Sequence, residues 1–189
     1  MVWLTFSFSH CIMASIGGIA MDQIIKDKVA ASIDRFRLPA YDAIPDVGLY
    51  LEQTAKYISD YLAPVCSSPI TGSMISNYVK KGLIKSPVRK QYSREQIAYL
   101  IFIAIGKLVL SMDDLLLMVE IQQRTYPSEV AYEYFRKELD TVLRFVFGRR
   151  GELDALGADA PDEKIMLRNV IITVAHKVYL DKLFAELHK

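Results

Sequence analysis

The sequence has few of the residues that build disulfide scaffolds or metal centres. Cys11 and Cys66 are its two cysteines, and they lack the paired spacing of a zinc site. Two cysteines are also too few for a disulfide framework. We therefore expect free thiols in a reducing, cytoplasmic setting, and we expect no metal or other cofactor.

Long apolar runs are also missing. The run from Ile97 to Leu110 contains Lys107, and it is shorter than the roughly 20 residues that cross a bilayer. Residues 1–20 carry no charged side chain, and so they lack the basic start of a secretory signal. We expect a loose extension here, with Met21 as an alternative start of translation. A membrane-attached regulator is the alternative if residues 1–20 insert.

Acidic residues are absent from one window of the chain. Residues 70–94 carry six basic side chains and no acidic one, whereas residues 1–69 carry five basic and seven acidic side chains. Residues 112–189 have eleven basic and fourteen acidic side chains, so the net charge of +1 conceals this distribution. A local positive potential attracts polyanions. The window is therefore the candidate surface for a nucleic acid or an acidic partner.

Apolar residues recur at steps of three and four, the spacing that places them on one face of a helix. This pattern predicts helices over residues 45–62, from 71 or 73 to 82, 93–108, 111–119, 128–147 and 161–188. Pro87 forbids a helix between residues 85 and 92, where we expect a small hairpin or wing. The expected fold class is all-α with a small wing.

The pattern also predicts which side chains are buried. Val47 is expected on the buried face of the first helix and Met74 on that of the second, while the helix over 93–108 is apolar almost all round and should be central. The helix over 161–188 has two apolar sides and needs two partners, and His176 among its apolar residues is expected in a core or an interface.

Three positions carry signals for helix ends. Ser93 stands three residues before Gln96, which predicts a capping box at the start of the central helix. Ser111 and Asp114 predict a second helix start of this kind. Gly82 is the expected end of the helix that precedes the wing. Together these signals give the order helix, turn, short helix, wing and capped helix.

This order, with its residues, resembles the DNA-binding domain of the MerR family. Tyr78 with Lys80-Lys81-Gly82-Leu83-Ile84 resembles the end of that family's recognition helix, Tyr92-Ser93 its wing closure, and Ser111 to Leu115 the start of its fourth helix. Two features depart from the pattern. Ser76 replaces a usual arginine, and the wing between Ile84 and Tyr92 is short.

The resemblance covers about Pro45 to Glu120. With Leu38-Pro39-Ala40-Tyr41 and Ile44-Pro45-Asp46, the pattern is also similar to a bacterial family described only as a domain of unknown function, which implies the same helix-turn-helix fold. The nucleic-acid-binding residues that we expect are Ser73, Ser76, Asn77, Lys80, Lys81, Lys85, Arg89, Lys90, Tyr92 and Arg94. Tyr92 is expected first as a residue that packs in the core or wing.

Three segments are expected on these grounds. They are an N-terminal extension and leader helix over residues 1–37, a MerR-like domain over 38–124, and a helical dimerisation or sensing unit over 125–189. We expect a non-enzymatic transcription regulator that binds double-stranded DNA as a homodimer and responds to an unidentified effector, because no catalytic motif is found. The alternative is an adaptor that uses the same fold for an acidic protein partner.

Overall fold

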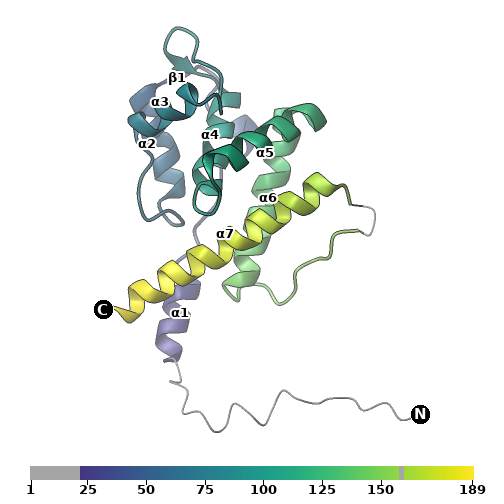
Figure 1. Ribbon diagram of the computed structural model, residues 1–189. Coiled ribbons are helices and arrows are strands. Elements are labelled where there is room, and N and C mark those ends of the chain that lie inside the picture. The colour runs from purple at the N-terminus through teal and green to yellow at the C-terminus, as the bar shows by residue number, and fades with distance from the viewer. Residues whose placement is uncertain (1–21, 158–159) are drawn as a thin grey trace, which may run out of the picture.

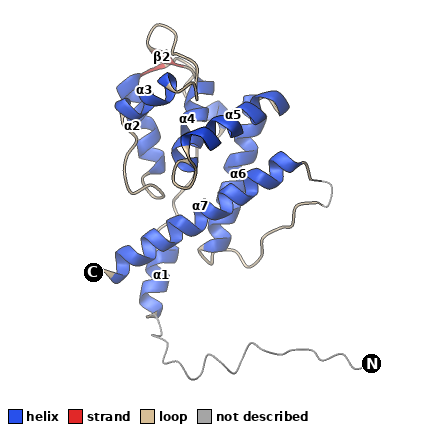
Figure 2. Ribbon diagram, viewed as in Figure 1, coloured by secondary structure: helices blue, strands red, loops and turns tan. Residues whose placement is uncertain are grey.

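The computed structural model describes residues 22–157 and 160–189, and within them the protein is all-α with one very small sheet (Figures 1 and 2). The expected fold class is thus confirmed. The elements are α1 (Gln23–Ala31), a 3-10 turn η1 (Tyr41–Ala43), β1 (Leu49–Tyr50), α2 (Leu51–Leu62), α3 (Gly72–Lys80), β2 (Gln91–Tyr92), α4 (Arg94–Gly106), α5 (Met112–Thr125), α6 (Ser128–Val146) and α7 (Asp162–Leu187).

The first helix after η1 is shorter than its sequence predicts. It begins at Leu51 rather than at residue 45, because Gly48 has a left-handed φ of 74° and Leu49–Tyr50 pair with β2. Val47 precedes the helix and is 82% exposed, so its predicted burial is wrong. Ala55, Ile58 and Leu62 are buried as expected.

The predicted helix starts at Ser93 and Ser111 are confirmed. The Ser93 hydroxyl accepts a hydrogen bond from the backbone N–H of Gln96, and the Gln96 side-chain oxygen accepts one from the backbone N–H of Ser93. Ser111 and Asp114 form the same reciprocal cap. The capped helix α4 buries residues on every side and contacts α2, α5, α6 and α7. The uniform apolarity of residues 97–105 therefore follows from the central position of α4.

The two C-terminal helices agree with prediction to within one residue at each end. Val174 and Val178 of α7 are almost fully buried, and α7 contacts α6, α1 and α4 (Figure 1). Both apolar sides of α7 are thus covered largely by its own chain. His176 is exposed, which rules out the core and leaves the interface that the sequence also allowed.

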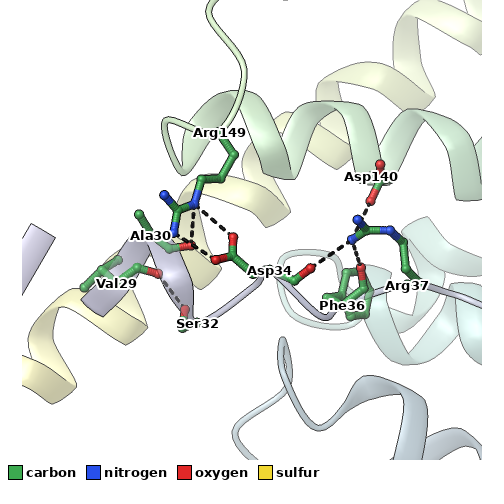
Figure 3. Close-up of polar contacts among 8 residues, drawn as sticks. All are labelled: Val29, Ala30, Ser32, Asp34, Phe36, Arg37, Asp140 and Arg149. Atoms are coloured by element: carbon green, nitrogen blue, oxygen red, sulfur yellow. Dashed lines mark hydrogen bonds and ion pairs between the residues drawn. The ribbon is translucent and has the colours of Figure 1, made fainter. Parts of the chain in front are cut away.

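The segment that joins α1 to η1 is fastened to the end of α6 by two arginines. Arg149 donates from Nε and one terminal nitrogen to the two carboxylate oxygens of Asp34, both at 2.9 Å, and Arg37 lies 3.4 Å from a carboxylate oxygen of Asp140 (Figure 3). Ile33 and Phe36 of this segment are buried. The leader is therefore part of the folded unit.

A buried ion pair joins α6 to α7. Arg168 donates to the Glu138 carboxylate, and their side chains are 13% and 10% exposed. Arg168 also donates to the backbone carbonyl of Asp154, so one guanidinium holds both helices and the loop between them.

Several expectations concern thiols and membranes. Cys66 is a free, half-buried cysteine whose burial raises its pKa to about 11, which keeps the thiol protonated at neutral pH. Cys11 and the predicted loose extension over residues 1–20 lie outside the described residues. Among the helices that the structure describes, none combines the length and apolarity needed to cross a membrane.

Candidate nucleic-acid interface

Helix α3 presents a polar face because its apolar residues are spaced to turn inward. The Thr71 hydroxyl caps the helix by accepting from the backbone of Met74 at 3.2 Å. Ile75 and Tyr78 are buried one turn apart. The opposite face carries Ser73, Ser76, Asn77 and Lys80, all of them exposed. Residues at these spacings lie side by side along a helix and can enter a groove together.

Met74 was expected on the buried side of α3 but is 38% exposed. The absence of a side chain at Gly72 allows the first turn of α3 to lie close to α2. A Cβ added at Gly72 would lie 2.5 Å from Oε1 of Glu52 and 3.2 Å from the Leu51 side chain. The first turn of α3 thus packs directly on α2, and Met74 lies beyond that contact.

The end of α3 follows from Gly82, as the sequence predicts. Gly82 has a φ of 80°, its N–H donates to the carbonyl of Val79, and Leu83 donates to the carbonyl of Tyr78. This pair of bonds is the Schellman motif, and its usual apolar contact is available because Leu83 and Tyr78 are both buried. Lys80 and Lys81 are thereby held at the exposed end of the helix.

The wing is a two-residue turn rather than a self-contained sheet. Val88 and Gln91 form an isolated antiparallel bridge around Arg89 and Lys90, whose φ values are 52° and 65°. The strand β2 pairs instead with β1, with Leu49 opposite Tyr92 and Tyr50 opposite Gln91. The expected wing is present, but its sheet partner comes from the segment before α2.

Five cations of the predicted site remain free of carboxylates. Within residues 22–157 and 160–189, no ion pair within 4.0 Å involves Lys80, Lys81, Lys85, Arg89 or Lys90, and all five are exposed. The turn that carries Arg89 and Lys90 lies near α3, at the end of the molecule away from α1 (Figure 2). Their positive charge is therefore available to a polyanion.

Of two further predicted residues, Tyr92 has the packing role that was expected of it first, and Arg94 serves the fold. Tyr92 is only 4% exposed, and burial raises the pKa of its hydroxyl. Arg94 donates from Nε to the carbonyl of Ile44 at 2.9 Å, and its guanidinium lies 5.8 Å from the centroid of the Tyr41 ring. Tyr92 is thus a core residue, and Arg94 fixes the segment before β1 against α4.

Sequence reasoning missed the contacts that close this part of the chain. The hydroxyl of Tyr132 donates to the carbonyl of Pro39, and the backbone N–H of Tyr41 donates to Glu133 at 2.8 Å. These partners lie more than 90 residues apart, and no local pattern identifies such pairs. They bind the segment before β1 to α6.

A family model matches residues 39–135, the part of the chain that contains α2 to α5 and these closing contacts. The chain belongs to the family described as Domain of unknown function (DUF1836). The DUF1836 match begins at Pro39 and ends at Phe135 in α6, so it includes the polar face of α3 and the wing. Comparisons with curated proteins and with solved structures give no match.

Proposed function

We propose that this DUF1836 protein is a DNA-binding transcription regulator that inserts α3 into the major groove. The observation that carries the proposal is the exposed face of α3, with Ser73, Ser76, Asn77 and Lys80 in one row. Hydroxyl, amide and ammonium groups are the side chains that read base edges and hold phosphates. The succession of α2, α3, wing and α4 resembles the MerR-like arrangement, which supports this use of α3.

The cations around α3 supply the affinity that does not depend on sequence. Lys80 and Lys81 end the helix, and Lys85, Arg89 and Lys90 follow in the wing, so they can contact phosphates beside the groove. Each neutralised phosphate releases counterions, which makes binding weaken as salt rises. Because the turn has only two residues, we expect the wing to contact the backbone rather than enter a groove.

The test compares two lysine pairs in the full chain. Replacing Lys80 and Lys81 with Ala should weaken binding to every duplex and lower the salt slope by about one for each lost phosphate contact. Lys26→Ala with Lys28→Ala removes the same charge from exposed positions on α1 and is the matched control. Fluorescence anisotropy at several salt concentrations measures both quantities.

Equal binding and equal slopes in the two variants would overturn the assignment to α3. A wild-type chain that binds no duplex at low salt, but binds an acidic protein, would favour the adaptor function instead. Sequence preference is tested separately, by selecting tight binders from random duplexes. Asn77→Ala should then relax the preference at one position with little effect on the salt slope.

The regulator is proposed to act as a homodimer, since one module of this size buries only about 600–1,000 Å² on DNA. Leu180, Phe184 and Leu187 form an exposed apolar row at the end of α7, and Ile24 is exposed on the contacting helix α1. Light scattering should give a dimer for the wild type and a monomer for Leu180→Asp with Phe184→Asp. Leu117→Asp on α5 is the control, and a wild-type monomer at high micromolar concentration would contradict the dimer.

A further inference from the structure

A cavity of about 170 Å³ lies among four helices, away from the polar face of α3. Its walls come from α4, α5, α6 and the first turns of α7. The lining includes exposed Thr125 and Val130, so the cavity opens to solvent. A concave, mostly apolar hollow with a few polar groups is the usual form of a small-molecule binding site.

The walls are rich in aromatic rings. Six of the lining residues are aromatic, namely Tyr99, Phe102, Tyr126, Tyr132, Tyr134 and Phe135. The rings of Phe102 and Phe135 already meet edge to face, with centroids 5.3 Å apart. Aromatic rings favour such edge-to-face or offset contacts with another ring. The wall thus suits a flat, apolar guest better than a flexible polar one.

The size of the cavity limits the guest. A cavity of roughly 150 Å³ with apolar walls holds one benzene molecule, whereas pockets for drug-sized ligands run to about 300–1,000 Å³. The cavity here is about 170 Å³. It therefore fits one ring, or two small fused rings, without rearrangement of the helices.

The charges near the cavity limit the guest further. Lys164 has its ammonium 5.2 Å from the centroid of the Tyr134 ring and makes no ion pair with the described carboxylates. The Glu163 carboxylate also lines the cavity without an ion pair among the described residues, and it accepts a hydrogen bond from the Tyr126 hydroxyl at 3.1 Å. The two charges at the wall are of opposite sign and offset one another, and the apolar remainder of the wall favours an uncharged guest because a charged one would lose its hydration.

The polar atoms of the wall supply one further observation. The Tyr134 hydroxyl is buried and has no hydrogen-bond partner among the described residues. Because this hydroxyl is not accessible to solvent, it is not presented to a guest in the open cavity. Gln122 also lines the cavity, and its side-chain nitrogen donates to the carbonyl of Tyr126 at 2.8 Å.

We propose that this cavity is a binding site for a small, uncharged aromatic molecule of one or two rings. The site lies between helices of the DNA-binding part and α7, so it is distinct from the proposed nucleic-acid interface. The proposal can be tested separately from DNA binding, because the experiment contains no DNA.

The experiment titrates the full chain with phenol and indole, using benzoate and benzylamine as the charged counterparts. Isothermal titration calorimetry should show saturable binding of at least one of the two uncharged probes and weaker binding of both charged ones. Ala131 lines the cavity, and Ala131→Leu should reduce the affinity by roughly tenfold or more because the added carbons occupy the space. Ala185→Leu makes the same change at an exposed position of α7 and should leave the affinity unchanged.

Methyl NMR locates the guest without any substitution, which covers the case of an Ala131→Leu chain that fails to fold. The methyl signals of Ala98, Met118, Ala131 and Met166 should shift on titration, because these residues line the cavity, while that of buried Ala175 should not. Three results would each overturn the proposal. They are no binding of phenol or indole, equal or tighter binding of either charged probe, and shifts confined to residues outside the cavity.

Discussion

Gly106 shows how one missing methyl group sets the distance between two helices. It is buried at the end of α4, and an added Cβ would lie 2.7 Å from Cδ2 of Leu115 on α5. Gly106→Ala should therefore lower the free energy of unfolding by about 1–3 kcal/mol through overpacking. Gly151→Ala is the control, because its Cβ would meet nothing within 4 Å. Urea denaturation measures both, and equal stability of the two variants would contradict the argument.

Glu133 gives the stability a dependence on pH. The hydrogen bond from Arg136 is the first cause that lowers the pKa of Glu133, and the backbone N–H of Tyr41 lowers it further, while burial opposes both. A lowered folded-state pKa contributes stability above the unfolded value, near 4.5, that is lost as the pH falls through the folded-state value. We expect Glu133→Gln to destabilise the protein at neutral pH.

The pH series for this prediction consists of urea denaturation from neutral pH to about pH 3. The difference in stability between wild type and Glu133→Gln should shrink as the pH falls below 4.5. Glu129→Gln lies at an exposed position of the same helix and should show no such convergence. A constant difference across the series would assign the effect to packing instead of charge.

At the scale of elements, local signals were readable from the sequence and distant pairings were not. The caps at Ser93 and Ser111 and the stop at Gly82 use residues within five positions of one another, so their chemistry is visible in a short window. The pairing of β1 with β2 joins segments some 40 residues apart, and no such window contains it. Val47 was misplaced for this reason, since β1 replaces the first turn of the expected helix.

The candidate site divides in the same way. The exposed row on α3 follows from helical spacing, and Lys85, Arg89 and Lys90 follow from the charge pattern. Tyr92 was included by resemblance and Arg94 also by the charge pattern, and their contacts with Leu49 and Ile44 reach the segment before α2. His176 lies outside the core, because an apolar pattern on both of its sides does not say which way the histidine itself points.

The wing turn offers a way to separate stability from charge. Arg89 and Lys90 both adopt left-handed backbone angles, which cost a residue with a Cβ on the order of 1 kcal/mol, whereas Asn-Gly is the preferred pair for such a turn. Arg89→Asn with Lys90→Gly should therefore raise the melting temperature and weaken DNA binding. Arg89→Ala with Lys90→Ala removes the same charge and should weaken DNA binding without raising the melting temperature.

Unchanged DNA affinity in both wing variants would remove the wing from the proposed interface. A lower melting temperature for the Asn-Gly variant would contradict the argument from backbone strain. The two measurements are independent, because thermal denaturation is made without DNA and anisotropy is made well below the melting temperature.

At the scale of the whole molecule, α7 links the leader helix to the central helix. Val178 is 1% exposed, and α7 contacts α1, α4 and α6. Val178→Asp should cost several kcal/mol and unfold the C-terminal helices, because a carboxylate would be buried without a partner. Thr173→Asp adds the same charge at an exposed position of α7 and should be nearly neutral. Circular dichroism against temperature measures the expected loss of helix. A variant that stays folded but becomes monomeric would instead place Val178 in a subunit interface.

The contacts of the leader with Arg149 and α7 also determine when the leader can fold during synthesis. Arg149 follows its partner Asp34 by 115 residues, and the α7 residues that contact α1 are translated later still. Translation adds about 5–20 residues per second. Val29, Ile33 and Phe36 of the leader therefore stay exposed to solvent for many seconds before α7 is available to cover them. The nascent chain therefore exposes an apolar segment until α7 has been made.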